Sequence, residues 1–328
     1  MELKKIQFKS RWMPLSAVLA LIVGLSVSCR PGRNFYVIEE LRVPAMQVLQ
    51  KVDAPLSDKH CFDFSGEKVC QQYPLRPGQK YYFRLLALAP AGSQPVQLKF
   101  TKLKRTKLSR PVSELNSSEI SCDSLFTEVD ASLASLGLSD SVLQSTVKQE
   151  TPLRVEEHVV SFTLPDKTVF DTELFAESLL PLYRIEYEAS SGNLRADKGS
   201  LTFPVVSESQ ASGSQSQTSS NAAACLSAVL SGVPSVSANV APSILSLTPG
   251  QNEVVGGSPV TLQMNFGDTA SAGRRRVQWY ISRGELQNQR SSSTELKFSG
   301  SEPLTAVGIV RDLQGGVDFA WSTFSANQ

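Results

Sequence analysis

The sequence predicts a mainly β chain with two β-sandwich domains, the first carrying a helical insertion, joined by a linker rich in Ser and Gln. Three observations support this fold class. Short alternating apolar runs bounded by Gly, Pro and Asp recur along the chain, one stretch changes to helical spacing, and one segment is almost purely polar. The 328 residues exceed one ordinary domain, and a hydrophobic content of 41% is enough for two cores.

The first predicted domain covers residues 35–206 and consists mostly of strands. In the strand over 41–48, Pro44 indicates a kink at a sheet edge, because proline cannot donate a ladder hydrogen bond. The turn Leu75–Gly78 precedes the longest apolar run of this domain. Strands are predicted at 35–38, 41–48, 81–89, 95–100, 159–164, 182–187 and 200–206.

Residues from about 113 to 150 change period and predict one or two helices inserted between strands. The segment 139–148 opens with an N-cap-like Ser-Asp pair. Apolar residues of this stretch recur at three- and four-residue steps: Leu125, Val129, Leu133 and Leu136.

A linker and strap over 207–239 follow the first domain. Residues 207–221 are almost pure Ser, Gln, Gly and Thr, a composition that cannot bury a core and behaves as a flexible spacer. The apolar stretch around Cys225 fits either a helix or a strap against one of the domains.

The second predicted domain covers residues 240–328. Its short strands at regular spacing predict an antiparallel sandwich. Trp279 is expected in the core, because Val277 and Ile281 lie on the same face of its strand. Strands are predicted at 242–247, 260–266, 277–281, 295–298, 304–310 and 317–323.

This segment carries the motifs Gly257-Ser258-Pro259, Trp279, Ile309-Val310-Arg311-Asp312 and Gly315-Gly316. These motifs are similar to those of bacterial immunoglobulin-like and PKD-type domains. Residues 40–45 and 75–79 more loosely resemble the leading domain of large Gram-negative surface lipoproteins. The resemblance implies immunoglobulin-like sandwiches but no activity, because neither family has a single shared function.

The N-terminus has the organisation of an export signal, predicted to be residues 1–28. Basic residues precede the uncharged run Leu15–Val27, which as a helix spans about 20 Å, less than the hydrocarbon core of about 30 Å. We therefore expect a removed signal rather than a permanent transmembrane anchor. Residues 1–28 hold four basic residues and one acid, so their removal changes the formal net charge from +1 to −2.

The small residues before Cys29 resemble the lipobox of bacterial lipoproteins, in which the cysteine becomes the acylated first residue. Ser26 stands where Leu is usual, and Ser26 and Ser28 also suit ordinary signal peptidase, so two processing routes are open. Cysteine parity favours lipidation, because an acylated Cys29 leaves an even number of thiols. The resemblance implies a lipidated tether over 29–34 and, since Arg30 rather than Asp follows, anchoring in a Gram-negative outer membrane, on a face that the sequence does not encode.

The remaining cysteines predict disulfides. Cys61 and Cys70 flank a turn-like loop, and a bridge there contributes about 2–3 kcal/mol. A zinc site would need further ligands, of which only His60 offers itself. By elimination Cys122 pairs with Cys225, although four cysteines permit three connectivities.

Charged segments admit a binding and a structural interpretation. The basic segment 99–110 suits phosphates or an acidic partner, but a solvated strand end and loop is favoured. Residues 274–276 are likewise interpreted as a charged loop, and His158 is expected at a solvent-exposed edge. Asp312 is expected to cap a turn. Three acids give a weak calcium signal at one end of the second domain: Asp268, Asp312 and Asp318.

Composition excludes most other function classes. The charge of +1 gives no field that favours nucleic acid, and two His with five Cys supply few groups for acid/base, nucleophilic or zinc chemistry. No GxSxG elbow, HExxH helix, P-loop or dinucleotide fingerprint occurs. We therefore expect no enzyme activity, no cofactor, no metal and no nucleic-acid partner.

The expected function is a non-enzymatic, lipid-anchored envelope protein that acts as an adhesion, binding or scaffold module. Its partners would be the membrane, through the lipid on Cys29, and an unknown protein or glycan. One alternative is a periplasm-facing accessory subunit of a larger envelope machine, docked through the basic segment and the stretch around Cys225. A second is an enzyme on envelope glycans, which would need a cleft with convergent carboxylates.

Overall fold

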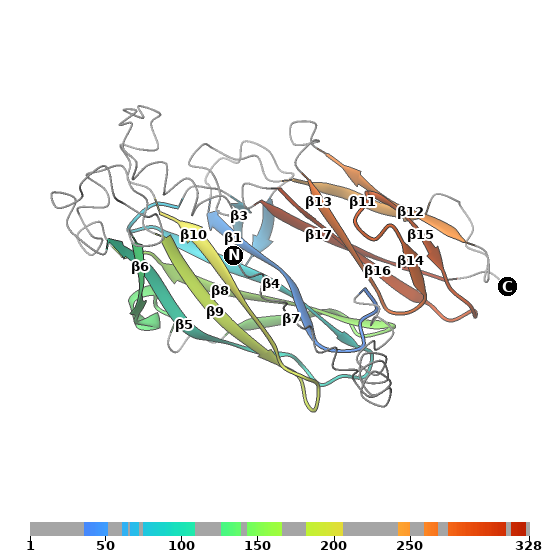
Figure 1. The fold of residues 1–328 in the computed structure, drawn as a ribbon, viewed down its shortest axis with the longest axis horizontal. Helices are drawn as coiled ribbons and strands as arrows, with labels where there is room; N and C mark the ends of the chain where they lie inside the picture. The colour runs from blue at the N-terminus through green and yellow to red at the C-terminus, as the bar shows by residue number, and fades with distance from the viewer. Residues whose placement is uncertain are drawn as a thin grey trace, which may run out of the picture. The chain divides into compact units, whose positions relative to one another are not determined.

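The structure, a computed structural model, describes residues 36–51, 61–64, 66–71, 75–108, 126–138, 143–165, 182–205, 242–249, 259–267, 275–312 and 316–325. All of them belong to one compact unit, 36–328. Their regular structure is almost entirely β (Figure 1). None of the described segments forms a helix with the length and apolar character needed to cross a membrane.

The first sandwich packs two antiparallel sheets, with strand orders β2-β3-β1-β4-β8-β7 and β10-β9-β5-β6. Its strands are β1 (Arg42–Lys51), β2 (Cys61–Phe64), β3 (Glu67–Gln71), β4 (Lys80–Pro90), β5 (Gln97–Leu108), β6 (Phe126–Ala131), β7 (Gln144–Gln149), β8 (Leu153–Thr163), β9 (Leu182–Ser190) and β10 (Asp197–Pro204).

The strand order of the first sandwich is immunoglobulin-like. With the hairpin β2–β3 set aside, lettering the strands A, B, C, C′, D, E, F and G in chain order gives sheets A-B-E-D and G-F-C-C′. The A-B-E-D sheet and a G-F-C sheet extended by C′ are the two layers of immunoglobulin domains. The hairpin β2–β3 extends the first sheet beyond β1.

Aromatic rings fill the space between these two sheets. The rings of Phe83 on β4 and Phe162 on β8 stack with centroids 4.1 Å apart. Phe203 on β10 stacks on Tyr183 of β9 at 5.8 Å and approaches Phe83 to 5.9 Å. Each buried ring removes a large apolar area from water, so this cluster holds the sandwich together.

The second sandwich has the strand order of a constant-type immunoglobulin domain. Its sheets, β11-β12-β15-β14 and β13-β16-β17, become A-B-E-D and C-F-G when lettered in chain order. Trp279 on the C strand is 1% exposed, as predicted. The strands are β11 (Ile244–Pro249), β12 (Val260–Phe266), β13 (Arg276–Ile281), β14 (Glu285–Gln287), β15 (Ser293–Lys297), β16 (Leu304–Arg311) and β17 (Val317–Phe324).

The predicted helical insertion over 113–150 is wrong for the described residues of that stretch. They form β6 and β7, with one 3-10 turn, η3 (Leu133–Leu136), between them. Residues 109–125 lie outside the described part. β6 pairs with β5 and β7 pairs with β8, so partner strands supply the backbone hydrogen bonds that a helix would have made internally.

Pro44 occupies a position where the ladder tolerates it. β1 lies between β3 and β4, but β3 pairs only with Leu49 to Lys51, and the pairing with β4 shifts register between Arg42 and Ala45. Pro44 therefore lies at a bulge where no ladder hydrogen bond is required of it.

The two sandwiches pack against each other through sheet faces. The outer face of β1, β4 and β8 meets the outer face of β13, β16 and β17. Because both faces of β4 and β16 are covered, these strands are apolar at nearly every position rather than at alternate ones. The buried residues of this junction are Ile38, Ala45, Leu86, Leu88, Leu153, Val155, Tyr280, Val307, Ile309, Val317 and Phe319.

Candidate functional site: the junction of the sandwiches and the exposed sheet faces

Arg84 anchors a polar network inside the junction. Its Nη2 lies 2.5 Å from Glu157 Oε1 and its Nη1 donates to Gln47 Oε1 at 3.0 Å. Gln47 Nε2 in turn donates to the carbonyl of Val317 in the other sandwich at 2.6 Å. The Arg84 guanidinium also lies 4.3 Å from the ring centroid of Phe319. The half-buried charge is thus paired on its own sheet and stacked on the opposite one.

Gln149 joins the far end of the junction. Its Nε2 donates to Thr305 Oγ1 at 2.6 Å, and Thr323 Oγ1 donates to Gln149 Oε1 at 3.0 Å. The two threonine hydroxyls lie 3.0 Å apart. One amide of β7 therefore contacts both β16 and β17.

Arg311 holds the rim of the junction at β1. Its guanidinium donates to the carbonyl of Pro44 and to Gln278 Oε1, and burial lowers its pKa. On the first sandwich, Tyr187 Oη donates to the carbonyl of Val43 at 3.2 Å, and burial raises the pKa of this tyrosine. The bulged start of β1 is thus held by groups from both sandwiches.

The segment before β1 pairs with the second sandwich rather than the first. Ile38 N donates to Ile281 O at 3.0 Å, Ile281 N donates to Tyr36 O at 2.8 Å, and Val37 forms a parallel bridge with Ile281. Of the strand predicted at 35–38 within the first domain, the described residues 36–38 therefore extend the edge of β13. We call residues 36–38 the edge segment.

A buried charged cluster lies between the sheets of the first sandwich. Glu156, fully buried on β8, accepts hydrogen bonds from Arg154 Nε, from Val96 N at 3.2 Å and from Ser145 Oγ at 3.1 Å. His158 Nε2 lies 3.4 Å from Glu156 Oε2. Burial raises the pKa of Glu156, but His158, Arg154 and the Val96 amide lower it further, to about 2.

The position of His158 in this cluster contradicts its predicted position, and the cluster itself was not predicted from the sequence. His158 was expected at a solvent-exposed edge, yet it is 1% exposed, because β7 and β4 flank β8 on both sides. The sequence signal for the cluster is the alternation of Arg154, Glu156 and His158 on one face of an apolar strand. The cluster joins β7, β8 and residue 96 within the core.

The Cys61–Cys70 disulfide is present. The two residues lie directly opposite each other in the β2–β3 hairpin, so the disulfide joins the two strands on either side of the predicted turn. Other predicted sites lie outside the described residues: Cys29, Cys122, Cys225 and His60.

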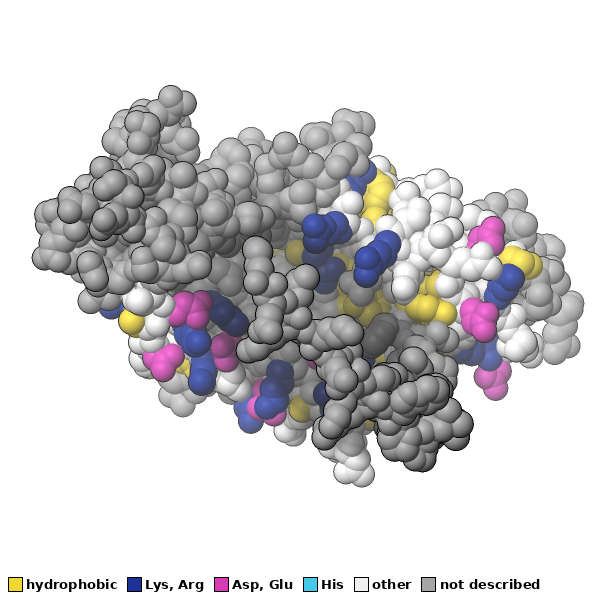
Figure 2. All heavy atoms as spheres, in the orientation of Figure 1, with side chains coloured by type: hydrophobic (Ala, Val, Ile, Leu, Met, Phe, Trp, Pro, Cys, Tyr) yellow, Lys and Arg dark blue, Asp and Glu magenta, His cyan; other side chains and the backbone are white. Residues whose placement is uncertain are grey.

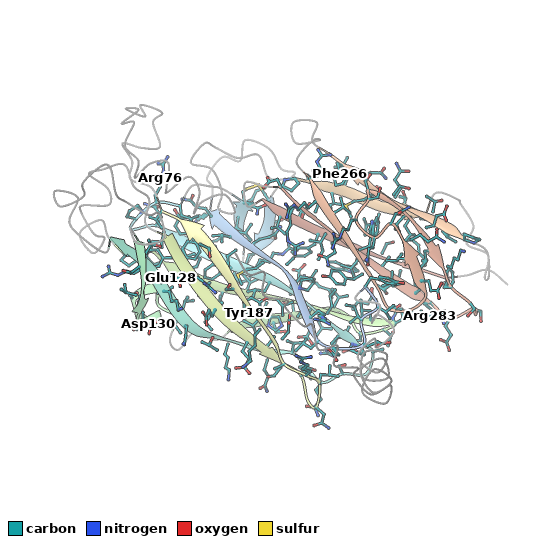
Figure 3. The ribbon with its side chains drawn as sticks, in the orientation of Figure 1. Arg76, Glu128, Asp130, Tyr187, Phe266 and Arg283 are labelled. Carbon is teal, nitrogen blue, oxygen red and sulfur yellow. A yellow bond between two sulfur atoms is a disulfide. The ribbon has the colours of Figure 1, made fainter. Side chains whose placement is uncertain are left out.

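The basic segment forms most of β5, in the interior of its sheet rather than at a strand end. Its outward lysines alternate with acids on the flanking strands: Lys99 Nζ lies 3.3 Å from Glu188 Oε2, and Lys104 Nζ lies 3.4 Å from Glu128 Oε2. Glu128 and Asp130 lie on the β6 side of this face (Figure 3). Exposed pairs of this kind add little stability, and the face carries mixed rather than uniform charge.

The acids proposed for calcium act as backbone acceptors. Asp312 Oδ1 accepts from Gly316 N at 2.7 Å, as expected for a turn cap, and Asp318 Oδ2 accepts from Ile244 N at 2.7 Å. Asp268 lies outside the described part. No group of three His, Cys, Asp or Glu residues within the described ranges is arranged to hold a metal ion.

No protein-family model and no curated protein sequence matches the chain. Solved structures with partial likeness include murine CEACAM1b, at 11% identity over 77% of this chain and 94% of that one, with a TM-score of 0.21. The ectodomain of mouse nectin-like molecule 4 gives 10% identity over 88% of this chain and 95% of that one, with a TM-score of 0.20. Fibronectin(III)-like modules of Clostridium thermocellum CbhA give 12% identity over 77% of this chain and 88% of that one, with a TM-score of 0.24. Such low scores carry no argument about function, and the fold assignment rests on the strand order.

Proposed function

We propose that this chain is a lipid-anchored protein of the outer membrane, held through Cys29, whose two immunoglobulin-like sandwiches act together as a non-enzymatic binding or scaffold module. The observation that carries the proposal is the apolar junction between the outer faces of the two sandwiches. Because this junction holds both sandwiches in one arrangement, a partner that contacts both would not have to order them on binding, which favours affinity.

Two sheet faces remain exposed on this frame and offer polar binding surfaces. On the first sandwich the face of β10, β9, β5 and β6 carries the mixed charges around Glu188 and Glu128. On the second, the face of β12, β14 and β15 is exposed at the residues Thr261, Gln263, Glu285, Gln287, Glu295 and Lys297. Side chains of this kind suit a protein or glycan partner recognised by hydrogen bonds and charge pairs.

Mass spectrometry of the mature N-terminus tests the anchor. The expected result is a peptide that begins at Cys29 and carries acyl chains, and an unmodified Cys29 or a retained signal contradicts lipid anchoring. Added protease on intact cells then separates surface exposure from the periplasmic face. Degradation without lysis supports a surface module, whereas degradation only after lysis supports the accessory-subunit alternative.

Photo-crosslinking in living cells tests the binding role. A photoreactive amino acid replaces Lys102 or Gln263, one on each exposed face, and a matched variant replaces exposed Glu302 in the turn before β16. We expect a discrete crosslinked species from one of the two faces and none from the turn. Absence of crosslinks from both faces, at normal protein levels, contradicts a binding module that uses these sheets.

A further inference from the structure

The edge of β13 that faces away from β16 carries the beginning of the described chain. The edge segment, residues 36–38, covers this edge at Ile281, and the turn after β14 covers it at Trp279, whose N donates to Gln289 O at 3.1 Å. Pairing at Ile281 is parallel, so the N-terminal end of the edge segment points toward the Arg276 end of β13. Cys29 precedes Tyr36 by seven residues, which span at most about 25 Å when fully extended.

Arginines gather along the same part of the second sandwich. Arg276 and Arg311 are direct cross-strand partners, although like charges in such positions repel each other. Arg290 lies next to Gln289 in the turn that covers β13, and Arg275 stacks on Phe266 at 4.4 Å. Arg276 and Arg290 are exposed, and neither has an ion-pair partner among the described residues. We call Arg275, Arg276 and Arg290 the arginine edge, and Arg311 is not part of it because its guanidinium is held by Pro44 and Gln278.

Acidic groups lie at the opposite end of β13. Glu39 and Glu40 follow the edge segment, and Arg283, just beyond Ile281, is paired with Glu302 at 3.0 Å. Phe266, which lies against Arg275, and Arg283 lie near opposite ends of β13 (Figure 3). Figure 2 shows several Lys and Arg side chains over the region of β13 and β17, with no Asp or Glu side chain among them. At the end toward which the edge segment points, Asp312 and Asp318 are buried or half-buried and accept backbone hydrogen bonds, so the exposed charges of the described residues there are those of Arg276 and Arg290.

We propose that the arginine edge binds the anionic phosphate headgroups of the membrane that holds the lipid on Cys29. The inference rests on the proposed lipid anchor, and the short span from Cys29 to Tyr36 keeps the second sandwich within reach of the headgroups. Each arginine near an anionic bilayer strengthens binding about fivefold, and the effect decreases with salt. The protein then lies against the bilayer through β13 instead of hanging from its anchor in any orientation.

Vesicle sedimentation tests the arginine edge separately from the anchor. The mature chain with Cys29→Ser, which carries no lipid, is mixed with vesicles of phosphatidylcholine alone or of phosphatidylcholine with phosphatidylglycerol. We expect binding only to the phosphatidylglycerol vesicles, decreasing as salt rises. Arg276→Glu with Arg290→Glu should weaken it by about 25-fold or more, because two favourable charges are lost and two repulsive ones are added. The matched variant Lys102→Glu with Arg195→Glu changes the charge equally on the first sandwich and should bind nearly as the parent does.

The outcomes separate this inference from the anchor. Equal binding to both vesicle types, no binding to either, or an equal loss in the matched variant overturns the arginine edge, even if mass spectrometry finds Cys29 acylated. An unmodified Cys29 overturns the anchor, and with it the placement of the arginine edge on the anchoring membrane. Circular dichroism of all variants confirms that the substitutions leave the fold intact.

Discussion

Replacing Phe319 with alanine tests whether the junction makes the two sandwiches one unit. Phe319 on β17 is 6% exposed, lies in the apolar junction and supports the Arg84 guanidinium on its ring. Truncating a buried phenylalanine costs about 3–5 kcal/mol, and loss of the cation–π contact adds about 0.5–2 kcal/mol. Arg84 keeps Glu157 and Gln47 as partners, so no charge is left unpaired. We expect a loss of about 5 kcal/mol, most of it from the coupling between the sandwiches.

Denaturant unfolding with two probes measures this coupling. The sequence has three tryptophans, and a protein prepared from Cys29 onward lacks Trp12. The other two, Trp279 and Trp321, lie in the second sandwich, so their fluorescence reports that half, whereas far-UV circular dichroism reports both halves. The parent should give coincident transitions, as a cooperative unit does, and Phe319→Ala should separate them. Phe298→Ala removes a ring from the interior of the second sandwich and should shift both probes together. Coincident transitions in Phe319→Ala, or separate ones in the parent, would refute the reasoning.

Three further predictions concern single residues and pairs. The pKa of Glu156 falls from 4.5 to about 2 on folding, so its contribution to stability is complete above about pH 4.5 and is lost as the pH falls toward 2. Glu156→Gln should therefore flatten the dependence of the urea midpoint on pH between these values. An unchanged slope would contradict the assignment. Gly199→Ala places a Cβ 2.3 Å from Tyr187 Oη and should cost about 1–3 kcal/mol in thermal unfolding, whereas Ser200→Ala beside it should be nearly neutral. Cys61→Ser with Cys70→Ser should cost about 2–3 kcal/mol, and reduction of the parent by dithiothreitol should reproduce that loss if the hairpin disulfide is its cause.

The helical prediction failed because spacing alone does not distinguish an edge strand from a helix over short stretches. Val129 and Leu133 are four positions apart, yet Val129 lies on β6 and Leu133 begins the 3-10 turn. On β6 the exposed Glu128 and Asp130 alternate with Val129 and Ala131, which is the period of a half-buried strand. The hydrogen bonds from β5, whose paired residues lie 18 to 28 positions earlier in the chain, decided the outcome, and no local propensity reports them.

The second sandwich was predicted more fully because its strands carry their own signal. Val260, Leu262 and Met264 alternate inward on β12, whose other face is exposed, so the period is read directly from the sequence. The three-residue strand β14 was not predicted, because it offers only Leu286 to the core. Short strands at sheet edges contribute too few apolar positions to produce a recognisable period.

The junction had a sequence signal whose meaning depends on the fold. In an antiparallel sandwich, a strand with one face in water alternates, whereas β4 and β16 are buried at nearly every position. Each of these strands therefore needs apolar side chains packed on its outer face as well. The outer faces of β4 and β16 cover each other, through residues such as Leu86 and Ile309. The sequence indicates which strands are covered twice but not what covers them, because the partner face lies more than two hundred residues away along the chain. The edge segment has the same property, since its backbone partner, Ile281, also lies more than two hundred residues away along the chain.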